Sequence, residues 1–238
     1  MNNIYTAKQV RAFEENSFIK KGDDLRAMMQ AAKQSVEVLN KDFSNSEFLI
    51  LCGPGNNGGD GYFIGIGLKK LKKRVKFLDV LDYVKKSPLC EYAFEAAKDL
   101  EFINSKTLKD ISSKTVLVDA IFGIGGRINL GSELEDILSA CNRFESKIAI
   151  DVPTGLDSNT GEISKACFNA DKTITFIGYK LGQRINEGKN YCGKLILKDL
   201  GFSMDENVSP TVKELSFEDI KINIPKRREN AHKGDHGK

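Results

Sequence analysis

Histidine is almost absent from this chain. The 238 residues include only two histidines, His232 and His236, and both lie within the last seven positions. Proton transfer in the folded core must therefore use the side chains of Asp, Glu, Lys, Tyr or Cys. A catalytic triad of serine, histidine and aspartate built into the core is excluded.

Cysteine is sparse and follows no recognisable spacing. The five cysteines form an odd, scattered set without a C-x-x-C pair: Cys52, Cys90, Cys141, Cys167 and Cys192. Such a set is typical of reduced thiols in the cytosol and argues against a disulfide framework or a zinc site. We interpret most of these cysteines as core residues.

Long apolar runs are also missing. No segment approaches the roughly 20 apolar residues of a membrane span, and the first four residues lack the basic and apolar regions of a signal peptide. We therefore expect a cytoplasmic protein with no membrane partner.

Neither sign of charge is in large excess. The 36 basic residues nearly balance the 33 acidic ones and leave a net charge of +3. This balance neither demands nucleic acid nor opposes a small ligand that carries phosphate. A basic cluster at residues 69–74 ends a predicted helix and lacks the interleaved aromatic side chains of a nucleic-acid patch. We predict no nucleic-acid partner.

What the chain does contain is a regular alternation of buried strands and helices. Short apolar runs predict strands at residues 48–51, 75–81, 116–118, 148–150, 173–177 and 195–197. Capping patterns at Thr6, Ser87 and Ser132 predict the starts of helices. This alternation predicts an α/β fold, a Rossmann-like three-layer α/β/α sandwich with a mostly parallel sheet. The length suits one such domain with or without a tail.

A glycine-rich stretch at residues 52–61 directly follows the first of these strands. Strand, glycine turn and helix N-terminus together make an anion site. Gly53, Gly55 and Gly58 match the dinucleotide fingerprint G-x-G-x-x-G, and Asp79 stands about where a ribose-binding acid is expected. Taken alone, this match is a weak signal.

The polar residues of the same stretch are more informative. The Walker A spacing is present, but Gly59 and Asp60 replace its Lys-Ser/Thr pair, and a carboxylate repels a triphosphate, so we reject a P-loop. Two carboxamides and a carboxylate at residues 56–60 are suited to hydrogen-bonding a sugar or binding a cation, whereas a plain turn needs only one Asn-Gly pair. We interpret this stretch as a functional loop.

Three strands of the predicted sheet end in polar segments, at residues 56–60, 119–127 and 151–157. Ligands of doubly wound sheets bind beyond the carboxyl ends of the strands, so we expect these segments to converge. Asp119 and Asp151 are each followed by more loop rather than by a helix, which favours function over capping. Oxygen atoms of Asn57, Asp119 and Thr154 are hard ligands that suit an alkali or alkaline-earth ion and not zinc.

At these residues the chain resembles the NAD(P)H-hydrate epimerase family, which repairs nicotinamide cofactors damaged by addition of water to the reduced ring. The resemblance extends over residues 4–202, and its motifs are residues 53–61, 119–123, 151–157 with 160–161, and 170–182. This length is that of a whole domain.

The resemblance implies a set of site residues. The substrate contacts fall on Asn56, Asn57, Gly58, Gly59, Asp60, Gly123, Ile124, Gly125, Gly126, Arg127, Ile128, Asn129 and Asp151. The family's potassium ligands fall on Asn57, Asp119 and Thr154. The family usually has serine at Thr154, which keeps the hydroxyl, and its arginine commonly lies one residue later than Arg127. A potassium ion and a homodimer are implied as well.

The C-terminal part of the chain lies outside this resemblance. We expect residues 1–205 to form the epimerase domain and residues 206–238 to be a linker or tail. Residues 231–238 resemble the opening of the NAD(P)H-hydrate dehydratase domain that is often fused behind the epimerase. The chain is therefore expected to be the N-terminal part of a bifunctional repair enzyme, or to carry a relic of one.

The resulting hypothesis is a cytosolic isomerase that interconverts the R and S epimers of hydrated NADH and NADPH. In it the ring nitrogen expels the hydroxyl, Asp119 handles the proton, Lys180 assists electrostatically, and potassium and the loop amides hold the diphosphate and ribose. One alternative is an NAD(P)-dependent oxidoreductase. The other is a noncatalytic scaffold of the same fold, and the carboxylates of Asp60, Asp119 and Asp151 argue against it.

Overall fold

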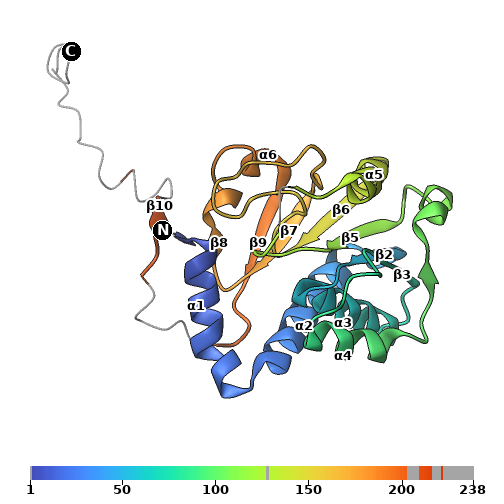
Figure 1. Ribbon diagram of the computed structural model, residues 1–238, viewed down its shortest axis with the longest axis horizontal. Coiled ribbons are helices and arrows are strands. Elements are labelled where there is room, and N and C mark those ends of the chain that lie inside the picture. Colours follow the sequence, from blue (N-terminus) through green and yellow to red (C-terminus); the bar gives the residue numbers. More distant parts are fainter. Residues whose placement is uncertain (1, 127–128, 203–208, 216–220, 222–238) are drawn as a thin grey trace, which may run out of the picture.

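A seven-stranded parallel sheet forms the centre of the protein (Figure 1). The computed structural model describes residues 2–126, 129–202, 209–215 and 221. The strand order is β4-β3-β2-β5-β6-β7-β9. The strands are β2 (Phe48–Cys52), β3 (Val75–Asp79), β4 (Phe102–Ile103), β5 (Val116–Ala120), β6 (Ser146–Ile150), β7 (Lys172–Phe176) and β9 (Lys194–Lys198). The predicted parallel sheet is confirmed, and the short edge strand β4 is added to it.

Helices cover both faces of this sheet. They are α1 (Ala7–Ser17), α2 (Asp24–Asp42), α3 (Asn56–Lys70), α4 (Pro88–Ala97), α5 (Ser132–Cys141) and α6 (Gly188–Tyr191), with short 3-10 turns at Ile19–Lys21, Ser105–Asp110 and Leu181–Gln183. Side chains alternate across β2: Phe48 and Ile50 join the core under α2, α3 and α4, whereas Leu49 and Leu51 join the core under α5. The three-layer α/β/α sandwich is confirmed.

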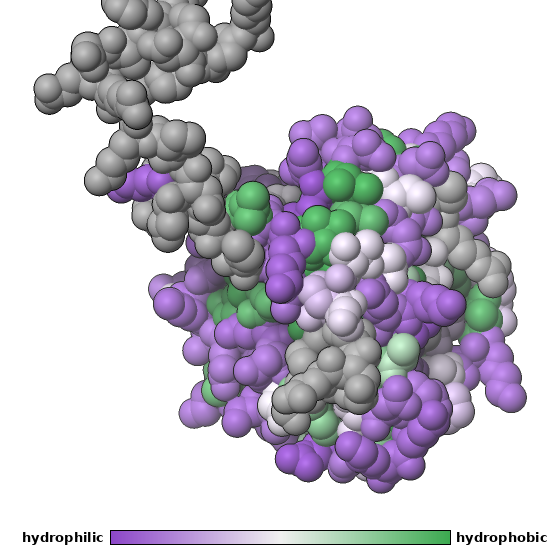
Figure 2. Space-filling view, turned by 90° about the vertical axis from the view of Figure 1, so that its left-hand side faces the viewer, coloured by the Kyte–Doolittle hydropathy of each residue, from purple (hydrophilic) through white to green (hydrophobic). Residues whose placement is uncertain are grey.

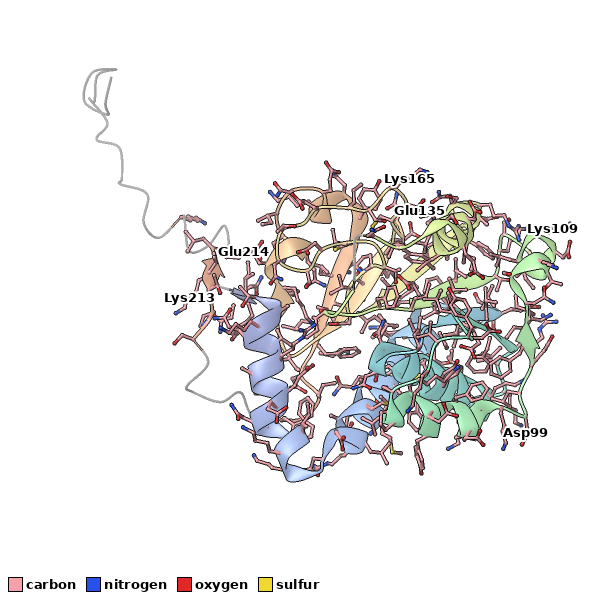
Figure 3. The ribbon with its side chains drawn as sticks, in the orientation of Figure 1. Asp99, Lys109, Glu135, Lys165, Lys213 and Glu214 are labelled. Atoms are coloured by element: carbon pink, nitrogen blue, oxygen red, sulfur yellow. The ribbon has the colours of Figure 1, made fainter. Side chains whose placement is uncertain are left out.

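A second, three-stranded sheet lies beside the main one. Its order is β10 (Val212–Glu214), β1 (Asn2–Tyr5), β8 (Tyr179–Lys180). The strand β1 pairs antiparallel with β10 and parallel with β8. Figure 3 shows Glu214 next to the start of α1, with Lys213 pointing outward. The sheet therefore joins segments from the beginning and the end of the described chain.

The predicted helix starts are confirmed at two of three positions. Thr6 forms a capping box with Gln9, and the Ser87 hydroxyl accepts a hydrogen bond from the Cys90 amide. The expected cap at Ser132 is wrong, because Ser132 is already the first helical residue and Gly131 is the N-cap, with a φ of 79°. The serine side chain is thus one position too late to cap the helix.

All five cysteines are buried and free. Among the described residues, no helix combines the length and the apolar character that crossing a membrane requires. The face that carries α1 and β10 is mostly hydrophilic, with small groups of hydrophobic side chains between the hydrophilic ones (Figure 2).

Candidate functional site

A cavity of about 1060 Å³ opens beyond the carboxyl ends of the parallel strands. Its wall is made by the segments that follow β2, β3, β5 and β6, together with residues of α1 and α2. Of the predicted contacts, those that line it are Asn56, Asn57, Asp60, Gly123, Ile124, Gly125, Asn129 and Asp151. Lys180 lines it too. The expected convergence of the strand ends is confirmed.

Residues 56–60 are helical, so the prediction that they form a loop is wrong. Asn56 is the first residue of α3, and Gly55 is its N-cap. A Cβ atom on Gly58 would lie 1.8 Å from the Gly53 carbonyl oxygen. Gly58 and Gly59 are buried in the first turns of the helix and do not line the cavity. The stretch is therefore rich in glycine because helix and strand approach closely.

Asp119 lies inside β5 and is fully buried. Its Oδ2 accepts a hydrogen bond from the Thr154 amide (2.8 Å), and its Oδ1 accepts from the Thr154 hydroxyl (2.8 Å) and the Ile121 amide (3.1 Å). Burial raises the pKa of Asp119 to about 6, although these hydrogen bonds oppose the rise. Neither Asp119 nor Thr154 lines the cavity.

Asn57 is buried and contacts the end of β6. Its Nδ2 donates to the Ile150 carbonyl oxygen (3.2 Å), whereas its buried Oδ1 has no hydrogen-bond partner among the described residues. Among the described residues, no Lys or Arg forms an ion pair with Asp119. The described residues also contain no group of three or more His, Cys, Asp or Glu side chains that could hold a metal ion. A cation held here would depend on carboxamide and hydroxyl oxygens as well as on the carboxylate.

Asp151 and Lys180 form a buried ion pair on the cavity wall. The exposed fractions of their side chains are 14% and 1%. The Lys180 Nζ donates to the Asp151 Oδ1, to the Thr175 hydroxyl (2.8 Å) and to the Phe176 carbonyl oxygen (2.9 Å), so its three protons are all used. The other Asp151 oxygen accepts from the Ile124 amide (3.1 Å). Asp151 has a φ of 67°, an uncommon backbone conformation that often occurs at functional sites.

The second glycine segment packs against Asp151. A Cβ atom on Gly123 would lie 2.7 Å from the Asp151 Oδ2, so a side chain at this position would displace the Asp151 carboxylate. Gly126 lines an adjoining cavity of about 320 Å³. Arg127 and Ile128, predicted as substrate contacts, lie outside the described residues.

Asp79, which matched the ribose-binding position of the dinucleotide fingerprint, is engaged elsewhere. Its carboxylate forms an ion pair with the Lys86 Nζ at 2.7 Å, and both side chains are largely buried. Lys86, and not Asp79, lines the cavity. Because Asp79 is paired with Lys86 and does not line the cavity, its carboxylate is not presented to a ribose hydroxyl there.

The contribution of α1 to the cavity wall was not predicted from the sequence. Arg11 and Glu14 both line the cavity. Glu14 follows the buried Val10 by four residues, so both lie on one face of the helix. The signal in the sequence was the charged residue Glu14 on the helix face that otherwise carries buried residues.

The chain matches a family model and several known proteins. The family described as "YjeF-related protein N-terminus" matches residues 25–182. An NAD(P)H-hydrate epimerase of Lentilactobacillus buchneri is 31% identical over 212 residues, which cover 84% of this chain and 95% of that protein. The bifunctional NAD(P)H-hydrate repair enzyme Nnr of Helicobacter pylori is 33% identical over 218 residues, which cover 88% of this chain and 45% of that enzyme.

A solved structure shares the fold. The crystal structure of yeast ynu0, YNL200c, matches with a TM-score of 0.68 at 20% identity, covering 90% of this chain and 97% of that one. The family match includes β2, β5 and β6, and also Asn57, Asp119 and Asp151. The family model matches residues 25–182, and the alignment with the Lentilactobacillus buchneri protein covers 95% of that protein. The chain therefore belongs to the family of YjeF-related protein N-termini.

Proposed function

We infer that this protein is an isomerase of metabolite repair that interconverts the R and S epimers of hydrated NADH and NADPH. The observation that carries this inference is the cavity at the strand ends, which joins polar side chains of the three predicted segments. Relatives named NAD(P)H-hydrate epimerase align over nearly their whole length. The Asp79–Lys86 ion pair argues against the alternative of an oxidoreductase built on the dinucleotide fingerprint.

The direct test is conversion of one pure epimer. We expect the protein to accelerate formation of the other epimer, measured by chromatography after subtraction of the spontaneous rate. Intact NADH serves as the control and should show no redox turnover. Redox turnover of the intact cofactor, or no acceleration over the spontaneous rate, would contradict the proposal.

We propose potassium as the ion of this site, held by oxygens of Asn57, Asp119 and Thr154. The unpaired Asn57 Oδ1 and the buried Asp119 carboxylate without a cationic partner in the described chain support a site for a hard cation. When bound, the ion supplies positive charge that offsets the buried carboxylate and attracts the diphosphate of the substrate. The helix N-terminus at Asn56 adds an anion-binding end to the same wall.

Potassium is expected to raise the melting temperature. At a concentration 100 times its Kd, an ion that binds only the folded state stabilises it by about 2.7 kcal/mol. Thermal melts in potassium chloride and in a bulky organic cation at equal ionic strength measure the effect. Asn57→Leu should reduce it, whereas Asn56→Leu, at the exposed neighbouring position, should not. Equal melting temperatures of the wild type in the two salts would exclude the ion site.

The geometry supports the electrostatic role proposed for Lys180 better than the proton-transfer role expected for Asp119. Lys180 lines the cavity and holds Asp151, which favours electrostatic assistance and positioning of Asp151 toward the substrate. Asp119 was expected to handle the proton, but it is fully buried and accepts three hydrogen bonds. Its geometry favours holding Thr154 and the ion.

We propose that residues 1–205 form the epimerase domain and that residues 206–238 lead to a fused dehydratase domain. The bifunctional Nnr relatives, of which this chain spans less than half, support this arrangement. We place the protein in the cytoplasm, since five buried free thiols suit a reducing compartment.

A homodimer is proposed as well. Large apolar side chains are exposed on two helices of one layer, with exposed fractions of 53% for Met29 and 58% for Tyr92. We expect sedimentation equilibrium at micromolar concentration to report a dimer. A monomer under these conditions would rule the dimer out.

A further inference from the structure

Glu14 is the acidic residue of α1 that lines the main cavity. The residue is half-buried, one turn from Arg11 and on the same helix face as Val10. Among the described residues its carboxyl group has no hydrogen-bond or ion-pair partner. It is therefore available to a ligand in the cavity.

The charged groups around Glu14 come from several elements. Arg11 belongs to its own helix, Asp60 to α3, Asp151 to the end of β6 and Lys180 to β8. The pKa of Glu14 is raised to about 7, first by burial and second by the Asp151 carboxylate, while Lys180 and Arg11 act in the opposite direction. Burial also raises the pKa of Asp60, with Asp151 and Glu14 as further causes. Glu14 thus exists in both protonation states near neutral pH, as a general acid and base requires.

Three other candidates for proton transfer near this wall, Lys180, Asp151 and Asp119, are less available. The three protons of the Lys180 ammonium are donated to protein acceptors. The Asp151 carboxylate is paired with that ammonium and accepts the Ile124 amide. Asp119 is fully buried and does not line the cavity. Glu14 lines the cavity, and within the described part of the chain no hydrogen-bond or ion-pair partner occupies its carboxyl group.

We propose that Glu14 is a catalytic residue, the proton donor to the hydroxyl group that leaves the hydrated nicotinamide ring. The proposal rests on the epimerase function inferred above. The lone pair of the ring nitrogen forms a double bond to the neighbouring carbon, the carbon–oxygen bond breaks, and its electron pair stays on oxygen. Glu14 protonates that oxygen, which leaves as water. Addition of water to the other face of the ring releases one proton, which restores the Glu14 carboxylic acid, so charges and atoms balance.

The test compares Glu14→Gln with the wild type and with Glu15→Gln, a change at the exposed neighbouring acid. We expect Glu14→Gln to lower kcat by about 100-fold or more, with KM within about threefold. In the wild type, the acid form is present below about pH 7, so kcat/KM should fall as pH rises through that value. This fall of kcat/KM with rising pH should disappear in Glu14→Gln and persist in Glu14→Asp and Glu15→Gln.

Thermal melts separate catalysis from folding. The folded-state pKa of Glu14 lies above its unfolded value, so its stabilising contribution is lost as pH rises through about 7. Glu14→Gln should therefore melt no lower than the wild type at pH 8. If wild-type protein accelerates epimerisation and Glu14→Gln does so equally, the role of Glu14 is overturned while the proposed function stands. A wild type without activity would overturn both.

Discussion

Replacement of Lys180 by methionine is expected to lower the free energy of unfolding by about 3–5 kcal/mol, because it leaves the Asp151 carboxylate without its cationic partner. Lys180 is 1% exposed and donates three hydrogen bonds inside the protein. Epimerase activity should fall with it, since Asp151 loses the contact that fixes its carboxylate on the cavity wall. Denaturant unfolding of wild type and variant measures the difference.

The matched control is Lys172→Met. Lys172 pairs with Asp42 at 2.7 Å, but the side chains are 29% and 26% exposed, and such a pair contributes only about 0–1 kcal/mol. The double variant Lys180→Met with Asp151→Asn should be more stable than Lys180→Met alone, because no unpaired charge remains. Similar losses for Lys180→Met and Lys172→Met would show that the buried pair is not a stabilising element.

The second large effect is expected for Asp119→Asn. Three donors contact the carboxylate, from Thr154 and Ile121, and an amide presents its own N–H₂ group to at least one of them. In potassium buffer at pH 7 the variant should lose about 1–3 kcal/mol of stability. The potassium-dependent rise in melting temperature should disappear, and turnover should fall by about 100-fold.

Substitutions at Thr154 provide the comparison. Thr154→Ser keeps the hydroxyl that donates to Asp119 and accepts from the Phe122 amide (3.2 Å), so it should retain the potassium response. Thr154→Val removes the hydroxyl and should resemble Asp119→Asn. An Asp119→Asn protein that keeps both its potassium response and its stability would refute the structural role given to this carboxylate.

Much of the main sheet could be predicted from sequence because each strand carries its own local signal. Strands such as Phe48–Cys52 and Val116–Ala120 are continuous apolar runs that are buried on both faces. Parallel pairing then brings their carboxyl ends to one edge, which is why Asn57 and Asp151 meet at the same cavity.

The small sheet and Glu14 could not be predicted in the same way. β1 and β10 are short, and they pair across more than two hundred residues, as in Asn2 with Glu214. A polar strand of three residues carries no periodic signal of its own. The charged groups that act on Glu14 include Asp60, Asp151 and Lys180, which are distant from it in sequence. The altered acidity of such a group is a tertiary property.

The position of β1 in the middle of the three-stranded sheet bears on where the chain can be shortened. A chain that ended at residue 205, the boundary suggested by sequence, would lack β10 and the Thr211 amide that donates to the Ile4 carbonyl oxygen (3.0 Å). One side of β1 would become an open edge with unpaired backbone groups, ready to add a strand from another molecule. Self-association of such a shortened protein would then result from the exposed edge of β1 and would not indicate a native interface. Residue 215 is the safer end point, because the pairing of Val212–Glu214 with β1 remains intact.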